Sequence, residues 1–151
     1  MPLTVLPGSA TVQVQPPAGP LLSQLFMISR TAPGLLPDNG TPTGFAWDSK
    51  GNVFPFVICL AQSCNIAQLP VSATPGGLHF VVYATGFGVR PGVVRIRIGT
   101  QTLSGVRRRR HPAGVDELHF DVPQDFPLRL YQAISAETPH GESNYLFVYL
   151  K

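Results

Sequence analysis

Val82-Tyr-Ala-Thr-Gly-Phe-Gly88 is the stretch that decides the fold predicted for this chain. It continues an alternating apolar run of Phe80, Val82 and Ala84, and a period of two residues is typical of a β-strand with one buried face. Gly86 and Gly88 end this run, and Pro91-Gly92 begins a second apolar run over residues 93–98. Two short strands separated by a glycine turn predict a small all-β domain rather than the core of an enzyme.

The composition extends this prediction to the whole chain. Its 151 residues suffice for one domain, or for one domain with a fragment of another. The 15 glycines and 16 prolines lie between apolar runs, which favours many short strands joined by turns over disorder. No segment keeps the 3.6-residue apolar period of a helix, and none approaches the roughly 20 apolar residues that cross a bilayer.

The clearest strands are expected in the second half of the chain. Their spacing, at about 8–12 residues, predicts an immunoglobulin-like antiparallel β-sandwich with Greek-key links. In the strand over 117–122, Leu118 and Phe120 are expected on one face, with His119 and Asp121 on the other. The last strand is apolar on both faces, so both are expected to be covered. The predicted strands cover 78–85, 93–98, 117–122, 128–136 and 144–150.

The first thirty residues predict a separate β-hairpin. Residues 11–15 alternate, a turn rich in proline follows over 16–20, and Leu22–Ile28 is the return strand. The same order of strand, turn and strand recurs over 126–150, so the hairpin has the form of the closing hairpin of a module. We therefore expect residues 1–30 to be the end of a preceding immunoglobulin-like module, and residues 31–151 to be a complete one.

Cys59 and Cys64 are the only cysteines and lie close together. In an oxidising compartment they are expected to form a disulfide, which would stabilise the fold by about 2 kcal/mol. The alternative is two reduced thiols beside a turn. No metal site is expected at this pair, because no second pair of ligands stands at a recognised spacing.

Arg107, Arg108, Arg109 and Arg110 form the sharpest charged feature of the chain. They account for four of its eleven basic residues, so the excess positive charge of +3 comes from this one segment and does not indicate a basic surface. Adjacent guanidinium groups suit the phosphates or sulfates of a polyanion, because they form bidentate, charge-assisted contacts. Nucleic acid is a poorer candidate, since no aromatic residues alternate with the arginines. The alternatives are a solvated inter-strand loop or a protease processing site.

No other residues predict catalysis or a cofactor. Asp116, Glu117, Asp121 and Asp125 are expected to be surface carboxylates, because they match no calcium-binding loop. The four histidines are scattered along the chain and fit no metal or catalytic spacing. Trp47 and Tyr83 are candidates for a sugar-stacking platform, although a single tryptophan is more often part of a core. We therefore expect a protein that is not an enzyme, with no catalytic residues, no metal and no cofactor.

Several motifs occur in a family order. They are Ala32-Pro-Gly34, Tyr83-Ala-Thr-Gly-Phe-Gly88, Val94-Arg-Ile-Arg-Ile-Gly99, Pro112-Ala-Gly-Val-Asp116 and Gly141-Glu-Ser-Asn144. With them the chain resembles the Solibacter uncharacterised C-terminal domain family, found at the ends of large exported acidobacterial proteins. It differs from the family pattern in three places. It lacks the beginning of the first module, it has a segment with two cysteines, and it has four arginines where a short turn is usual.

The resemblance implies a fold and a location rather than a reaction. Members usually carry two immunoglobulin-like modules in tandem, which agrees with a hairpin ahead of a complete module. The family has no established activity. Residues 1–19 lack the pattern of a signal peptide, so a secreted or cell-surface location implies that this signal lies upstream.

Two functional hypotheses follow. The first is a structural or adhesion module whose partners are other immunoglobulin-like modules, copies of itself, or polysaccharide of the envelope or matrix. Its hairpin would complete a neighbour's sheet by strand addition and so build a filament. The alternative is a module that binds anionic glycans or other polyanions through Arg107–Arg110.

Overall fold

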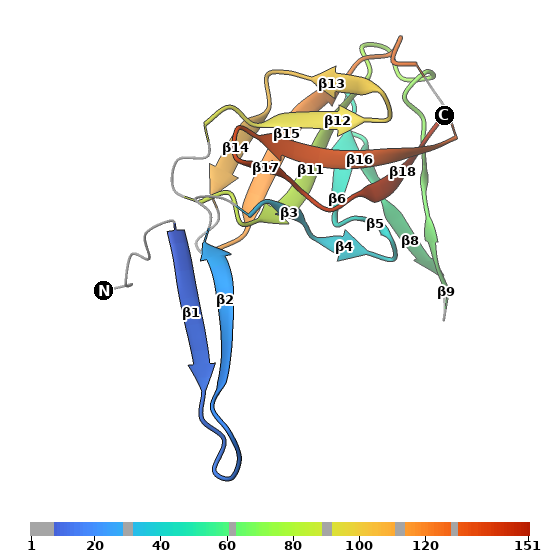
Figure 1. The fold of residues 1–151 in the computed structure, drawn as a ribbon. Coiled ribbons are helices and arrows are strands. Elements are labelled where there is room, and N and C mark those ends of the chain that lie inside the picture. The colour runs from blue at the N-terminus through green and yellow to red at the C-terminus, as the bar shows by residue number, and fades with distance from the viewer. Residues whose placement is uncertain (1–7, 29–31, 61–62, 89–91, 111–113, 128–129) are drawn as a thin grey trace.

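The computed structural model describes residues 8–28, 32–60, 63–88, 92–110, 114–127 and 130–151 (Figure 1). These residues form strands and no helix, which confirms the predicted all-β class. The strands are β1 (Gly8–Val14), β2 (Leu22–Ile28), β3 (Gly34–Leu35), β4 (Pro37–Asp38), β5 (Thr41–Pro42), β6 (Gly44–Trp47), β7 (Val53–Pro55), β8 (Val57–Leu60), β9 (Ser63–Ile66), β10 (Gln68–Leu69), β11 (Leu78–Thr85), β12 (Arg95–Ile98), β13 (Gln101–Leu103), β14 (Arg107–Arg110), β15 (Asp116–Val122), β16 (Tyr131–Thr138), β17 (Gly141–Glu142) and β18 (Leu146–Leu150).

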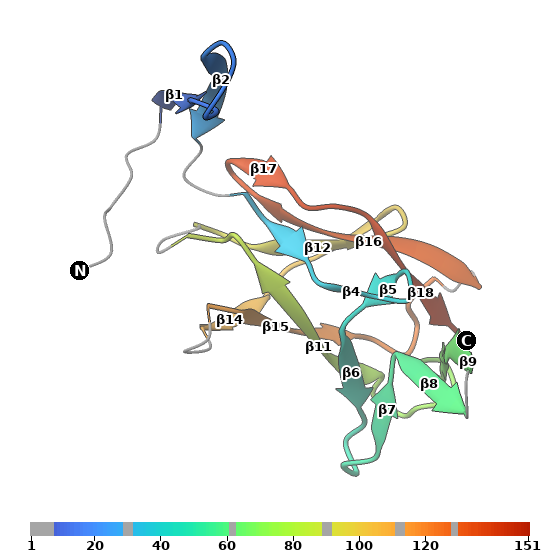
Figure 2. The ribbon, with the colours of Figure 1, turned by 90° about the horizontal axis from the view of Figure 1, so that it is seen from below.

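Two large sheets form the body of the molecule. The β11 sheet has the order β14-β15-β11-β6-β7, with β3 also paired to β11. The β16 sheet has the order β10-β18-β16-β12-β13, with β17 also paired to β16. Pairing is antiparallel within both sheets except between β10 and β18, which run parallel. Figure 2 shows the two sheets as opposed layers.

The core lies between these layers. Phe80 of β11 and Phe120 of β15 are directly opposite in the ladder, and their ring centroids are 5.4 Å apart. From the β16 sheet, Ile96 and Ile134 complete the same cluster, and all four side chains are buried. The alternation predicted for β15 is confirmed, because its even-numbered residues are buried while His119 and Asp121 lie on the outer face. Burial of alternate residues from both sheets accounts for the two-layer form.

Gly86 ends β11 where the sequence predicted a turn. Its φ of 79° is left-handed, a conformation that glycine adopts without steric cost. The backbone of Ala32 approaches closely here, and Ala32 N donates a hydrogen bond to Gly86 O at 2.7 Å. A Cβ at position 86 would overlap the Ala32 carbonyl oxygen. The turn at Gly86 therefore fixes the backbone at Ala32, where the chain enters the two-sheet body.

The predicted N-terminal hairpin is present as β1 and β2. All seven residues of β1 pair with β2, from Gly8 opposite Ile28 to Val14 opposite Leu22. Figure 1 shows the hairpin projecting from the body, and within the described residues its two strands belong to neither large sheet. Val12, Val14 and Leu22 lie on one face of the hairpin and are 51%, 54% and 60% exposed.

Several boundaries differ from the prediction. Residues 53–60 form the two short strands β7 and β8, separated at Phe56, which is 1% exposed in the core. The strands expected from 93 and from 144 begin two residues later, at Arg95 and Leu146. The strand expected over 128–136 is β16, which begins at Tyr131 and continues to Thr138; residues 128–129 lie outside the described residues. Strand β13 was not predicted, because its short polar sequence has no apolar alternation.

Candidate functional site

The four consecutive arginines form an edge strand. Residues 107–110 are β14, which pairs with β15 at the end of the β11 sheet, so the expectation of an inter-strand loop is wrong. Four identical residues carry no apolar alternation, and the sequence therefore gave no strand signal. Pairing nevertheless alternates their side chains between the two faces of the sheet. The four guanidinium groups are thus not one continuous cluster.

Arg108 is an internal residue of the fold. Its guanidinium forms an ion pair with Asp116 Oδ1 at 2.9 Å and donates a hydrogen bond to Gly88 O at 2.7 Å. It also lies 6.0 Å from the centre of the Phe87 ring. The contact between Arg108 and Asp116 is short enough for an ion pair, but its angles are not those of a hydrogen bond. Arg108 Nε is also buried and has no hydrogen-bond partner among the described residues. Arg108 therefore supports the turn at Gly88.

The other three arginines remain exposed to solvent. Arg107, Arg109 and Arg110 lie opposite His119, Glu117 and Asp116 in the ladder. The carboxylates of Asp116 and Glu117 contact Arg108 and His119 respectively. The described structure therefore leaves three guanidinium groups, rather than four, for an anion.

The carboxylates near β15 are not all surface groups as expected. Asp116 is 2% exposed and pairs with Arg108, so its prediction as a surface carboxylate is wrong. Glu117 and Asp121 lie on the outer face of the β11 sheet, each in contact with a histidine. Asp125 is exposed as predicted.

A cluster of rings occupies this outer face, which sequence analysis did not predict. The pairing of β11 with β15 and β6 brings together His79, His119 and Trp47. The Trp47 ring centroid is 4.4 Å from that of His79, and the two histidine centroids are 5.5 Å apart. Trp47 is half-buried against these rings, outside the core between the sheets. Tyr83 lies four residues farther along β11, about 13 Å from His79 at strand spacing, so it does not join Trp47 in one platform.

The two histidines belong to a chain of four polar side chains, which we call the imidazole chain. It consists of Asp121, His79, His119 and Glu117. Nδ1 of His79 is 2.7 Å from Asp121 Oδ1, and Nε2 of His79 is 3.3 Å from Nδ1 of His119. Nε2 of His119 is 3.3 Å from Glu117 Oε2. The side chains of two histidines that are 40 residues apart in sequence are therefore in direct contact.

An open hollow of about 440 Å³ lies over the imidazole chain. Trp47, His79 and His119 form part of its lining, and Arg107 reaches it from the edge strand. Asp48 and residues 75–77 also belong to its lining. The hollow therefore combines an aromatic ring, two imidazoles and groups of both charges. Within the described residues, no three His, Cys, Asp or Glu side chains are arranged as a metal-binding group.

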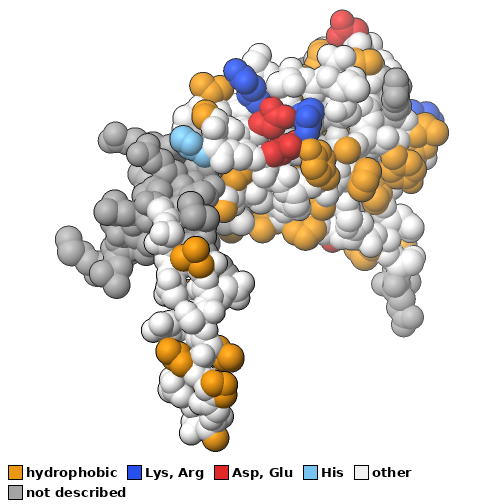
Figure 3. Space-filling model, viewed as in Figure 1, with side chains coloured by type: hydrophobic (Ala, Val, Ile, Leu, Met, Phe, Trp, Pro, Cys, Tyr) orange, Lys and Arg blue, Asp and Glu red, His pale blue; other side chains and the backbone are white. Residues whose placement is uncertain are grey.

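The outer face of the β16 sheet carries a second exposed group, the aromatic stripe formed by Tyr131, Tyr145, Phe147 and Tyr149. Tyr131 and Tyr149 are opposite in the ladder and stack with centroids 4.6 Å apart. Tyr131, Tyr145 and Phe147 are 59%, 53% and 49% exposed, so the expectation that both faces of the last strand are covered is wrong. Figure 3 shows hydrophobic side chains gathered on this side of the body, beside a group of acidic and basic side chains.

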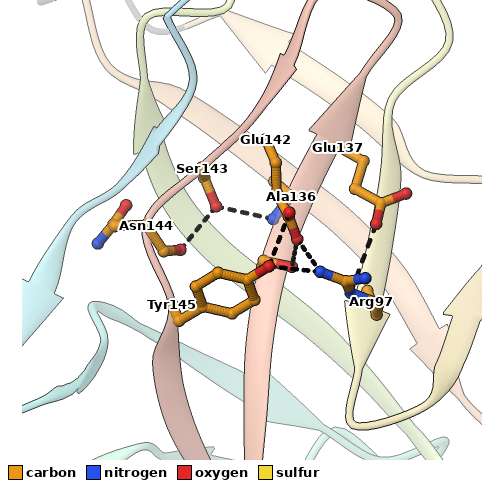
Figure 4. Close-up of polar contacts among 8 residues, drawn as sticks. Arg97, Ala136, Glu137, Glu142, Ser143, Asn144 and Tyr145 are labelled. Atoms are coloured by element: carbon orange, nitrogen blue, oxygen red, sulfur yellow. Dashed lines mark hydrogen bonds and ion pairs between the residues drawn. The ribbon is translucent and has the colours of Figure 1, made fainter.

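A polar network fixes one end of the aromatic stripe (Figure 4). Tyr145 Oη donates to Glu142 Oε2 at 2.7 Å and accepts from Arg97 at 2.6 Å, while Arg97 also pairs with Glu142 and Glu137. The hydrogen bonds from Ser135 and Tyr145, together with the Arg97 charge, lower the pKa of Glu142. The hydrogen bond to Glu142, with partial burial, raises the pKa of Tyr145. These contacts hold Tyr145 in place at the surface.

Cys59 and Cys64 form the predicted disulfide. They are directly opposite in the β8–β9 ladder, with an S–S distance of 2.05 Å. Ile58 and Leu60 beside them are 46% and 70% exposed, so this hairpin also presents apolar side chains. The disulfide joins two strands that belong to neither large sheet.

No helix among the described residues has the length and apolar character needed to span a membrane. Comparison of the chain with protein-family models, with curated proteins and with solved structures finds no match. The resemblance proposed from the motifs therefore stays a prediction.

Proposed function

We propose that the chain is a non-enzymatic structural or adhesion module of an exported or cell-surface protein, with an immunoglobulin-like β-sandwich fold and Greek-key links. The strand order supports this fold. The order β14-β15-β11-β6 parallels strands D, E, B and A of an immunoglobulin domain, and β13-β12-β16-β18 parallels C′, C, F and G. The disulfide supports export, because such bonds persist in oxidising compartments.

The single observation that carries the adhesive role is the exposed N-terminal hairpin. An isolated two-stranded hairpin is marginally stable in water and gains stability when its apolar face is covered. Val14 and Leu22, opposite each other on that face, are more than half exposed. We therefore assign this face to a partner module, either the preceding module or a second copy of the chain.

Strand addition is the mode that suits such a hairpin. Strand β7 ends the β11 sheet opposite β14, and β13 ends the β16 sheet opposite β10, in the described structure. The edges of a sheet present unpaired backbone groups. A hairpin that pairs with such an edge extends the sheet and buries its own apolar face. Repetition of this head-to-tail contact yields a filament when the rotation between neighbouring copies does not close a ring.

Light scattering coupled to size-exclusion chromatography tests self-association. The native chain is expected to increase in mass with concentration. The double variant Val14→Ser, Leu22→Ser is expected to stay monomeric, while Gln13→Ser, on the opposite face of the hairpin, should behave as the native chain does. A compact monomer at every concentration would end the proposal that the hairpin joins copies of the chain.

The exposed arginines of β14 favour a second candidate function, the binding of an anionic glycan or another polyanion. Arg107, Arg109 and Arg110 are all exposed at an edge strand. Arg107 and Arg109 lie on its outer face and Arg110 on the other, so a linear polymer along this edge would contact them from both faces. The triple change of these residues to serine should abolish salt-sensitive retention on heparin or polyphosphate. Arg108 must be retained in this variant, because its change would disturb the fold itself. Unchanged retention of the triple variant would rule out this function.

A further inference from the structure

We propose that His79 and His119 form a binding site for a divalent transition-metal ion, such as Cu²⁺ or Zn²⁺, on the outer face of the β11 sheet. The two residues lie on neighbouring strands in diagonal positions, because His79 is opposite Asp121 and His119 is opposite Val81. Their facing nitrogens, Nε2 of His79 and Nδ1 of His119, are 3.3 Å apart. This site goes beyond the proposed structural role and does not depend on it.

The hydrogen-bond roles within the imidazole chain favour a positive charge between the two rings. An ionised carboxylate only accepts hydrogen bonds, so Asp121 requires N–H at Nδ1 of His79, and Glu117 requires N–H at Nε2 of His119. A neutral imidazole has one N–H, which is then used at the outer nitrogen of each ring. Both facing nitrogens are left with lone pairs directed at each other. A positive charge between them, from a proton or a metal ion, removes this repulsion.

The distance between the facing nitrogens suits a metal ion. Bonds of about 2.0–2.1 Å from Zn²⁺ to imidazole nitrogen place two ligands of a tetrahedral ion about 3.3–3.4 Å apart. The two nitrogens of His79 and His119 already have this separation. The rings are inclined by 38°. Each ring would have to turn by about 35° for its lone pair to leave the line between the two nitrogens and meet the other at an ion bound at these lengths.

The carboxylates supply the outer contacts of such a site. Histidines that bind metals almost always donate their other N–H to a carboxylate, a carbonyl or water, which orients the ring and raises its basicity. Asp121 and Glu117 are in this position on His79 and His119 respectively. Trp47 packs on the His79 ring and further restricts its orientation. The two imidazoles are therefore held toward each other before any ion binds.

Two protein ligands leave coordination positions open to the hollow. Water or a donor atom of a bound molecule would complete the shell there, with Arg107 on the same lining favouring an anionic donor. Imidazole ligands favour copper, nickel and zinc over calcium and magnesium, which prefer oxygen. Among the divalent ions of this series, Cu²⁺ is expected to bind most tightly.

Trp47 provides a direct assay, because it is the single tryptophan of the chain and its ring lies 4.4 Å from that of His79. Titration of the untagged protein with CuCl₂ should quench its fluorescence with saturation at one ion per chain, and ZnCl₂ should reverse the quenching by competition. His79→Gln and His119→Gln are each expected to abolish the saturable phase. Asp121→Asn should weaken binding about tenfold or more through the orientation of His79.

His140→Gln is the matched control, since it removes an exposed imidazole in the turn between β16 and β17 and should leave the titration unchanged. Circular dichroism checks that each variant is folded. A second readout is the melting temperature, which ZnCl₂ should raise for the native chain and not for His119→Gln. Quenching without saturation, or equal quenching in the native chain and both histidine variants, would overturn the proposal.

Discussion

Replacement of Gly86 by alanine tests how far the fold depends on the contact between Gly86 and Ala32. At a φ of 79°, a residue with a Cβ loses about 1–2 kcal/mol relative to glycine. The new Cβ would overlap the Ala32 carbonyl oxygen, so the two backbones must separate. Separation breaks the hydrogen bond from Ala32 N to Gly86 O, at a cost of about 0.5–1.5 kcal/mol. Displacement of the packed turn adds to both, and we expect the free energy of unfolding to fall by about 2–4 kcal/mol.

Gly105→Ala is the control for this measurement. Gly105 has the same φ of 79°, but nothing lies within 4 Å of a Cβ built there, so only the backbone cost applies. Urea unfolding followed by circular dichroism gives the free energy of unfolding for both variants and the native chain. If the two variants differ by less than about 0.5 kcal/mol, the contact with Ala32 contributes no measurable stability and our reasoning is refuted.

Three further predictions concern other contacts of the body. Asp116→Asn leaves the enclosed guanidinium of Arg108 without its counter-charge, and urea unfolding should show a loss of about 3 kcal/mol, whereas Arg110→Ser should change stability by less than about 0.5 kcal/mol. The pKa of Glu142 is lowered by folding, so its stabilisation is complete above the ordinary value of 4.5 and is lost as pH falls through the lowered pKa. Melting temperatures between pH 3 and pH 6 should therefore fall less steeply with acidification for Glu142→Gln than for the native chain. Replacement of Cys59 and Cys64 by serine should reduce the free energy of unfolding by about 2 kcal/mol, and dithiothreitol should lower the stability of the native chain but not of this variant.

Much of the fold could be predicted because its signals are local. The strand over 78–85 has the bounds predicted from its apolar alternation, and the hairpin of β1 and β2 follows from two alternating runs around a turn of prolines and glycine. The disulfide was predictable for a similar reason, since Cys59 and Cys64 are near each other along the chain. Strand β14 could not be predicted in this way, because four identical residues show no alternation between apolar and polar side chains.

The candidate sites depend on partners that are far apart in sequence. His79 and His119 fit no motif, and only the register between β11 and β15 brings their rings together. The pairing of β14 with β15 separates Arg108, which is enclosed with Asp116, from Arg107, which lines the hollow. No property of the individual residues indicates these contacts.

The sequence by itself determined the all-β class, the glycine turn and the disulfide, because period-2 alternation, left-handed backbone and short-range pairing are properties of a few neighbouring residues. The tertiary structure alone decided which side chains became neighbours across strands, and which aromatic residues stayed uncovered. Tyr145 and Phe147 are apolar residues that alternate with the buried residues of the last strand, and the same sequence would suit a strand covered on both faces. Their exposure follows from the absence of a third described layer over the β16 sheet, and strand alternation carries no information about that layer.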